Sequence, residues 1–221
     1  MMSAQSAREL RFAGTLTYRK KIWNVLVRDF FQKYVSPDDA VVDLGCGYGE
    51  FINTVQCAKK FAMDLNPDAP KYLVSGVQFL DQDCASPWRL ESGALNVVFT
   101  SNFFEHLPGK GALGRTLDEI FRCLAPGGKL IAMGPNIKYL AGEYWDFWDH
   151  YLPLIEKSLS EGLINRGFEI IECVGKFLPY TMVDQRPYPG VFLKLYLRLP
   201  LAWRIFGKQF LVVAVKPERS Q

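Results

Sequence analysis

Closely spaced glycines follow an acidic residue near the start of the chain. Asp43 precedes Gly45, Gly47 and Gly49 in the run DLGCGYG, directly after the β-branched stretch AVV. Glycines in a turn after a strand let the backbone approach a ligand and direct its N–H groups at it. A second acid, Asp64 in AMDLNP, lies where another strand would end, and its carboxylate can accept hydrogen bonds from both hydroxyls of a ribose. The combination predicts a site for a cofactor that contains a nucleoside.

The spacing of the glycines differs from that of a dinucleotide site. A dinucleotide fingerprint reads G-x-G-x-x-G, but the position expected for its third glycine, counted from Gly45, is Glu50. A carboxylate beside a pyrophosphate would add like-charge repulsion. We therefore expect a cofactor other than NAD or FAD, and a nicotinamide oxidoreductase is the less favoured alternative.

Two histidines could act as general bases, because histidine titrates near neutral pH without perturbation. His106 lies in NFFEHLPG, just past an expected strand, where the cleft of an open α/β sheet should be. His150 ends the cluster EYWDFWDH, residues 143–150. We favour His150 over His106 as a base; the alternative for His106 is a capping or packing role.

The same cluster combines acids with aromatic rings. Tyr144, Trp145 and Trp148 could stack on an acceptor and form a lid over it, or the segment could be a hydrophobic cover whose charges face water. Asp146 and Asp149 next to His150 match no strong ligand motif, so we expect no metal.

Short apolar strands alternate with helices along the chain. The expected strands lie in the runs AVVDLG, FAMDL, VQFLDQD, LNVVFTSN, KLIAMGPN, FEIIECV and FLVVAV, and the expected helices are residues 17–35 and the runs GYGEFINTVQCA, GRTLDEIFRCL and SLSEGLINRGF. This alternation predicts an α/β fold, a Rossmann-like doubly wound sheet of seven strands. The last two strands have no clear helix between them, which predicts one antiparallel edge strand. We expect a single domain over residues 1–221, with insertions on the acceptor side near 135–155 and 184–208.

The segment 190–208 is basic and apolar. It holds Lys194, Arg198, Arg204 and Lys208 but no acid, and on a helical wheel the four cations fall within about 120°. Pro200 should kink such a helix. One interpretation is an amphipathic element that contacts a membrane surface or receives a lipid-linked acceptor, and the other is a helical cap with solvated cations.

Composition limits the classes of protein that are possible. The 221 residues are 49% hydrophobic with a net charge of +3, which excludes a disordered chain and does not argue for nucleic acid as a partner. Five cysteines without a CxxC pair indicate reduced thiols. The N-terminus is polar and no run approaches about 18 consecutive apolar residues. We therefore expect a cytoplasmic protein, with peripheral contact to a membrane as the variant that the segment 190–208 suggests. The oligomeric state stays open.

Five motifs in order carry a resemblance to a known family. VVDLGCGYGEF, AMDLNP, FLDQDC, LNVVFTSNFFEHL and LAPGGKLIAMGPN resemble the successive motifs of class I S-adenosylmethionine-dependent methyltransferases, over roughly residues 38–175. The aromatic and late segments also resemble, more loosely, methyltransferases of small molecules and glycans. The stretch PDAPKYLVSG carries two prolines, so the family's second helix should be short here.

The resemblance implies roles for residues at the methionine end of the cofactor. The backbone of Gly45, Cys46 and Gly47 would line that end, and Asp43 would hold the loop and the amino group. Asn102 and Phe103 would lie under the sulfonium.

It also implies roles at the adenosine end. Asp64 would bind the ribose hydroxyls and Leu65 would pack on the adenine. Asp83 would accept from the adenine amino group, while Cys84 would supply a backbone N–H to a ring nitrogen.

The expected function is methyl transfer from S-adenosylmethionine to a small-molecule, glycan or lipid-linked acceptor, at oxygen. Because a sulfonium methyl is already activated, the protein must mainly align donor and acceptor, and a base is needed only for a group such as a hydroxyl. A cofactor-binding protein of the same fold without activity is the alternative.

Overall fold

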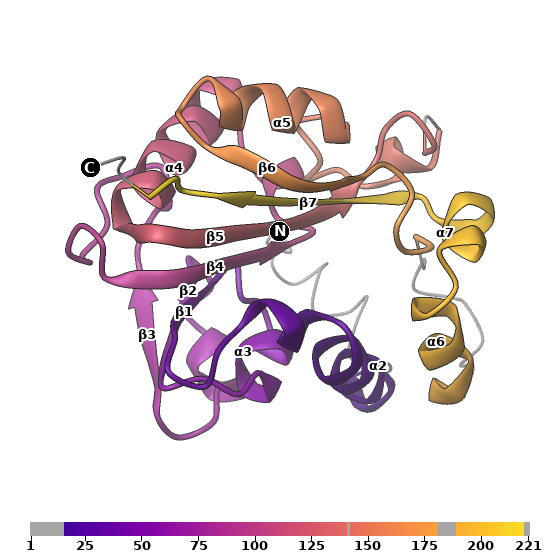
Figure 1. Ribbon diagram of the computed structural model, residues 1–221, viewed down its shortest axis with the longest axis horizontal. Helices are drawn as coiled ribbons and strands as arrows, with labels where there is room; N and C mark the ends of the chain where they lie inside the picture. The colour runs from indigo at the N-terminus through magenta and orange to yellow at the C-terminus, as the bar shows by residue number, and fades with distance from the viewer. Residues whose placement is uncertain (1–15, 141, 181–188, 219–221) are drawn as a thin grey trace, which may run out of the picture.

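The computed structural model describes residues 16–140, 142–180 and 189–218 (Figure 1). The ends of the expected domain, and residues 184–188 of the late insertion, lie outside this part of the chain.

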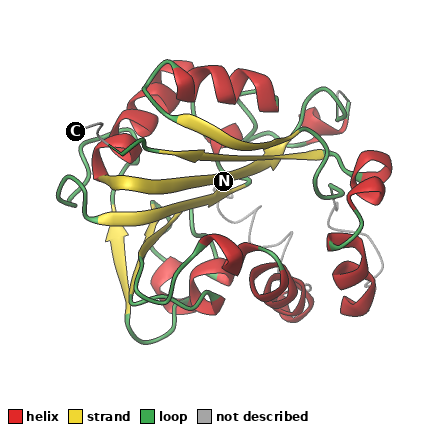
Figure 2. Cartoon of the chain, viewed as in Figure 1, coloured by secondary structure: helices red, strands yellow, loops and turns green. Residues whose placement is uncertain are grey.

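A seven-stranded sheet with the order β3-β2-β1-β4-β5-β7-β6 forms the centre of the molecule (Figure 2). Its strands are β1 (Ala40–Leu44), β2 (Lys59–Asp64), β3 (Val77–Asp81), β4 (Leu95–Ser101), β5 (Leu124–Pro135), β6 (Glu169–Val174) and β7 (Gln209–Val215). The first five strands pair in parallel, so the carboxyl ends of β1, β2 and β4 meet at one edge of the sheet. The seven-stranded Rossmann-like sheet is as predicted.

The antiparallel pairing at the β6 end of the sheet is also confirmed, with a detail that the sequence did not reveal. β7 pairs antiparallel with β5 on one side and with β6 on the other. The last strand of the chain therefore lies second from the edge, between two strands that precede it in sequence.

Helices cover both faces of the sheet (Figure 1). They are α2 (Leu16–Asp29), α3 (Glu50–Thr54), α4 (Lys110–Cys123), α5 (Glu156–Ile164), α6 (Gly190–Leu197) and α7 (Pro200–Phe206), with 3₁₀ turns η1 (Phe31–Tyr34), η2 (Ala69–Tyr72), η3 (Phe104–His106) and η4 (Glu143–Asp146). The short η2 stands where the two prolines predicted an abbreviated helix.

The helix expected over residues 17–35 is interrupted. α2 ends at Asp29, Phe30 leaves the helical region with φ −135°, and a 3₁₀ turn follows. Phe30 and Phe31 are both buried, and adjacent residues on a helix lie about 100° apart, so the break lets both rings enter the core.

Two apolar cores lie on the two faces of the sheet. In β1, Val42 and Leu44 belong to one core and Val41 to the other, as the alternation along a strand requires. β1 is buried along its whole length, which is typical of a central parallel strand.

The late segment forms two helices. α6 ends at Leu197, and Pro200 is the first residue of α7, where a missing N–H costs nothing. The predicted kink is thus a complete break. Among the helices of the described residues, none is both long and apolar enough to cross a membrane.

Candidate functional site

The glycine turn between β1 and α3 has the backbone that its sequence implied. Gly45, Gly47 and Gly49 have φ of 71°, 52° and 70°, in the left-handed region that favours glycine. A Cβ on Gly45 would lie 2.3 Å from the ring of Phe103, whereas a Cβ on Gly47 would meet nothing within 4 Å. The turn is therefore packed tightly on one side and leaves open space at Gly47.

Hydrogen bonds fix this turn to the end of β2. The amides of Gly45 and Cys46 both donate to the carbonyl oxygen of Met63, at 2.9 and 3.1 Å. The amide of Gly47 donates to Asp64 Oδ2 at 2.8 Å, and Asp64 Oδ1 accepts from the amide of Asn66 at 2.9 Å. An ionised carboxylate has about four acceptor sites, so Asp64 keeps capacity for further donors such as ribose hydroxyls.

Asp43 is buried at the end of β1, where its Oδ2 accepts from the amide of Ile52 at 3.3 Å. Burial raises the pKa of this carboxyl well above its usual range, and the negative charges of Glu50 and Asp64 raise it further. Glu50 is itself paired with Arg19 of α2 at 2.7 Å. This ion pair offsets the charge on Glu50, so the like-charge argument against a pyrophosphate is weaker than the sequence suggested.

The residues expected at the adenosine end lie around the ends of β2 and β3. Leu65 is 63% exposed, and Asp83 is exposed with Oδ1 accepting from the amide of Ala85 at 2.9 Å. Cys84 is buried, and burial raises the pKa of its thiol to about 11. The exposed apolar side chain of Leu65 is free to cover a flat ring.

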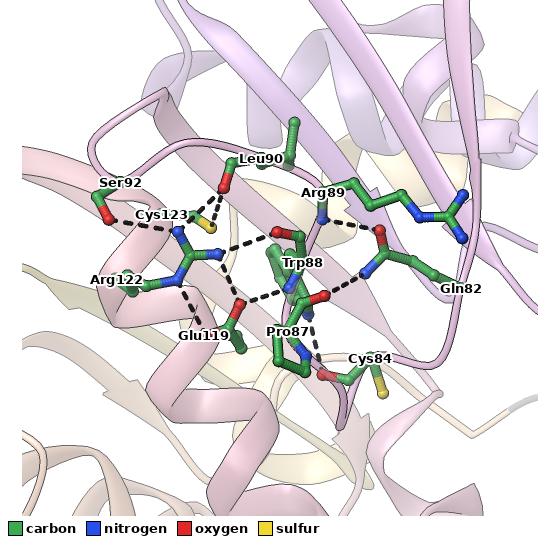
Figure 3. Close-up of polar contacts among 10 residues, drawn as sticks. All are labelled: Gln82, Cys84, Pro87, Trp88, Arg89, Leu90, Ser92, Glu119, Arg122 and Cys123. Carbon is green, nitrogen blue, oxygen red and sulfur yellow. Dashed lines mark hydrogen bonds and ion pairs between the residues drawn. The ribbon is translucent and has the colours of Figure 1, made fainter.

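The loop that carries Asp83 and Cys84 is anchored by hydrogen bonds to an ion pair within α4 (Figure 3). Arg122 binds Glu119 at 2.7 Å and also donates to the carbonyl oxygens of Trp88 and Leu90, at 3.2 and 3.0 Å. Glu119 accepts from the amide of Trp88 at 2.6 Å, and the Trp88 indole N–H donates to the carbonyl of Cys84 at 2.9 Å. Two charged residues outside the lining of the cavity described below thus help to fix the position of Cys84.

Asn102 and Phe103 follow β4 at the same edge of the sheet. Asn102 has φ 49°, an unusual value outside glycine, and its amide donates to the carbonyl of Met133 at 2.9 Å. Its Oδ1 is buried without a hydrogen-bond partner in the described part of the chain. A buried acceptor of this kind beside an open cavity suits a ligand that brings a donor.

A cavity of about 260 Å³ joins the glycine turn to the predicted acceptor side. Five of the predicted cofactor-binding residues line it, namely Asp43, Gly45, Cys46, Gly47 and Asn102. The two histidines, His106 and His150, also line it. Asp64, Leu65, Asp83, Cys84 and Phe103 are not part of this lining as the described residues define it. The cavity is therefore lined by residues predicted for the methionine and acceptor end, whereas those predicted for the adenosine end lie outside its lining.

The structure brings the two histidines together. Their ring centroids are 5.1 Å apart, and a carboxylate oxygen of Glu105 and one nitrogen of each ring lie within 4.8 Å of one another. His106 Nδ1 is 2.7 Å from the carbonyl of Asp149, and His150 Nδ1 is 2.9 Å from the carbonyl of Tyr144.

The predicted acceptor-binding residues Tyr144, Trp145 and Trp148 are not among the described residues that line the cavity, although the rings of Tyr144 and Trp145 lie 4.9 Å apart. Tyr144 is fully buried, donates its hydroxyl to the carbonyl of Leu152 at 2.7 Å and lies 4.7 Å from the ring of His150. Trp145 is exposed, and Trp148 is 88% exposed. Phe147, which the sequence did not single out, faces the cavity instead.

The sequence did not identify the part of the cavity wall that α2 and β7 form. Tyr18, Ile22, Trp23 and Leu26 of α2 line it, together with Gln209 at the start of β7. The sequence predicts that one face of α2 is apolar. It does not reveal whether these apolar residues pack in the core or line a cavity, because both show the same helical spacing. Gln209 gave a weaker signal, a lone amide ahead of an apolar strand, and its Oε1 is buried without a partner among the described residues.

The sheet order, the left-handed glycine turn and the acid at the end of β2 define a class I methyltransferase fold. The residues fit S-adenosylmethionine: open space at Gly47, a buried acceptor on Asn102, and carboxylates around the turn that suit a cationic ligand.

The chain belongs to the methyltransferase domain family, whose model matches residues 16–172. The protein is thus a methyltransferase that depends on S-adenosylmethionine.

Known proteins agree with this assignment. A demethylmenaquinone methyltransferase from Symbiobacterium thermophilum is 26% identical, with the match covering 79% of this chain and 73% of that protein. A SAM-dependent methyltransferase from Archaeoglobus fulgidus superposes with a TM-score of 0.69 at 20% identity, over 93% of this chain and 99% of the other. A methyltransferase solved in complex with the Haloferax volcanii Trm112 activator superposes with a TM-score of 0.65 at 19% identity, over 97% and 96% of the two chains. At these identities the two structures show the fold alone.

Proposed function

We propose that the protein methylates a hydroxyl oxygen of a small-molecule, glycan or lipid-linked acceptor. The observation that carries this proposal is the single cavity that joins the glycine turn to both histidines. When bound, S-adenosylmethionine supplies an activated methyl group. The acceptor oxygen forms the new C–O bond, the sulfur keeps the electrons of the broken S–C bond, and the hydroxyl proton leaves to a base.

His150 and His106 are the candidate bases. In both rings Nδ1 faces a backbone carbonyl, which favours the Nδ1–H tautomer and leaves Nε2 to accept a proton. The walls nearby are apolar, with Ile22, Trp23 and Leu193, so they would hold the carbon skeleton of an acceptor and exclude water.

The relative from Symbiobacterium supports a second candidate, an apolar quinone of the kind in its name. The same apolar walls favour a quinone acceptor. Such an acceptor would be methylated on carbon, whereas the first candidate would be methylated on oxygen.

The α6–α7 segment supports a lipid-linked acceptor and contact with a membrane surface. Large apolar side chains are exposed along both helices, namely Val191, Phe192, Leu195, Leu199, Leu201, Ile205 and Phe206. The opposite side is buried through Leu193, Leu197 and Trp203, so the segment is apolar on both sides. An exposed apolar patch of this kind is typical of interaction surfaces.

The cations of this segment differ from the sequence-based expectation. Lys208 is bound to Glu143 at 2.7 Å, and Lys194 lies 3.4 Å from Asp29. Only Arg198 and Arg204 then remain to attract anionic lipids, so apolar contact would dominate. We propose a cytoplasmic protein that contacts the membrane through α6 and α7 and takes no nucleic acid as acceptor.

Incubation of extract fractions with labelled S-adenosylmethionine tests the function. We expect label in a small organic-soluble product whose methyl group is on oxygen, and loss of that label in His150→Gln. Label on carbon would favour the quinone, and label only in nucleic acid or protein would contradict the proposal. Calorimetry with S-adenosylhomocysteine on the same preparation verifies that the cofactor site is intact.

A further inference from the structure

A carboxylate and two imidazoles converge on the acceptor side of the cavity. A carboxylate oxygen of Glu105 and one nitrogen each of His106 and His150 lie within 4.8 Å of one another. Glu105 is 4% exposed and His150 is 7% exposed. All three residues line the cavity.

In both rings Nδ1 lies within hydrogen-bond distance of a backbone carbonyl, and Nδ1 of His106 also lies 3.4 Å from Asp149 Oδ2. Nδ1 of His106 and Nδ1 of His150 each face a carbonyl oxygen, at 2.7 and 2.9 Å. Since a carbonyl can only accept, this contact favours the Nδ1–H tautomer in each ring, in which the ring lone pair is on Nε2. A hydrogen bond from the other ring nitrogen to a carbonyl is typical of histidines that bind metals, because it fixes both the tautomer and the ring orientation.

The fold itself brings the three donors together. Glu105 and His106 lie in η3, directly after β4, and His150 lies 44 residues later in the segment after η4. The amides of Tyr151 and Leu152 both donate to the carbonyl oxygen of Glu105, at 2.8 and 3.0 Å. The backbone of Glu105 therefore holds the segment that carries His150.

We propose that Glu105, His106 and His150 bind one divalent transition metal ion of the zinc class. Two imidazoles and one carboxylate form a ligand set of catalytic zinc sites, which keep a fourth position for water or substrate. With bonds of about 2.0–2.1 Å, tetrahedral donors stand roughly 3.4 Å apart, so donor atoms that now lie within 4.8 Å of one another need to approach by up to about 1.4 Å. Mg²⁺ prefers an all-oxygen shell and is not expected to bind here.

The site opens into the cavity that holds the predicted acceptor. If the proposed function is correct, the acceptor hydroxyl takes the fourth position, and the metal ion lowers the pKa of that hydroxyl, so that its proton is released to solvent. The histidines then act as ligands, and neither serves as the free base suggested above.

The chain has only two histidines, which allows a direct test. Tag-free protein labelled with ¹⁵N-histidine is titrated with Zn²⁺ in the absence of cofactor and acceptor. We expect two rings in the Nδ1–H form before addition, a shift of both Nε2 resonances at one equivalent of zinc, and no effect of Mg²⁺. Substitution by Co²⁺ should give the intense visible bands of a tetrahedral site.

Variants then separate ligands from neighbours. Glu105→Gln and His150→Gln should each weaken zinc binding more than tenfold, whereas Glu143→Gln, a carboxylate held by Lys208 outside the cluster, should not. Because thiols also bind zinc, the titration is repeated with Cys57→Ser and Cys173→Ser, which should leave it unchanged.

Zinc binding that leaves either ring unshifted, or that Glu105→Gln does not weaken, would overturn the proposal. The spectra of the unsubstituted protein decide the matter even where a variant fails to fold. Since no methyl transfer is measured, a failure here is distinct from a failure of the proposed methyltransferase function.

Discussion

At the residue scale, the glycine turn separates two causes of a glycine requirement. Gly45 has a left-handed backbone and a neighbouring ring 2.3 Å from where a Cβ would lie, whereas Gly76 has φ 90° and nothing within 4 Å. Gly76→Ala should cost only the backbone strain, about 1–2 kcal/mol of unfolding free energy. Gly45→Ala adds overpacking against Phe103, for a total of about 2–5 kcal/mol.

Urea denaturation of both variants measures the difference. Equal losses in the two proteins would show that the contact between Gly45 and Phe103 relaxes at little cost.

Asp64 combines a structural and a binding role, since it accepts from Gly47 and Asn66 and keeps acceptor capacity toward the ribose. Asp64→Ala should weaken binding of S-adenosylhomocysteine by a factor of roughly 10 to 100, the range expected when a charged hydrogen-bond acceptor is lost. Isothermal titration calorimetry provides the measurement, and Asp68→Asn on the neighbouring turn is the control. Unchanged affinity in Asp64→Ala would exclude it from the cofactor site.

Asp43 links cofactor binding to pH. Its pKa in the free protein is raised by burial and by neighbouring carboxylates, so folding favours the protonated form and ionisation costs stability as the pH rises. A bound ammonium group would favour the carboxylate, so binding should release a proton and the affinity should rise with pH.

Calorimetry in two buffers of different ionisation enthalpy detects that proton. Asp43→Asn should abolish the difference between the buffers, and a buffer-independent enthalpy in the unsubstituted protein would contradict the role of Asp43.

At the scale of elements, α4 holds the loop that carries Asp83 and Cys84, the residues predicted to bind the adenine. Arg122 and Glu119 hold the loop of Trp88 and Cys84, and the hydrogen bond from Arg122 lowers the pKa of Glu119. This stabilisation is complete above the carboxyl's unfolded pKa, near 4.3, and is lost as the pH falls through the lower folded value. Arg122→Ala should cost about 1–3 kcal/mol and weaken cofactor binding without touching the cofactor.

Thermal unfolding between pH 3 and pH 7 tests this coupling, with Arg166→Ala, whose partner Asp118 lies on the same helix, as the matched control. If Arg122→Ala kept the unsubstituted pH profile, the ion pair would not contribute to stability.

Features that are determined by residues close together in sequence could be predicted, and features that depend on tertiary packing could not. The strand ending at Asp43 and the turn at Gly45 follow from short-range patterns, and the fold confirms both. The lining by Trp23 and the exposure of Trp148 depend on tertiary packing that no local pattern encodes. His106 and His150 were each selected, but the proximity of His150 to Glu105 and His106 arises from a loop that returns to η3.

At the scale of the whole molecule, the α6–α7 surface predicts behaviour at membranes. Co-sedimentation with vesicles should show binding to neutral lipid and only modestly stronger binding to anionic lipid, because Lys194 and Lys208 are paired within the protein. Replacement of Leu201, Ile205 and Phe206 by Ser should reduce binding at least tenfold.

Neutralisation of Arg198 and Arg204 should remove only the preference for anionic lipid. Equal binding by the protein with three serines would show that this face contacts something other than lipid.

The position of β7 has a consequence for how the protein is made. β7 is the last strand in sequence, yet it is the neighbour through which β6 joins the sheet, and it brings Gln209 to the cavity. During synthesis on the ribosome, the edge of β5 stays unpaired until residues 209–215 emerge, and a chaperone that recognises open strand edges would have its substrate for that interval. Because Gln209 is part of the lining, the cavity is complete only after this strand has been synthesised.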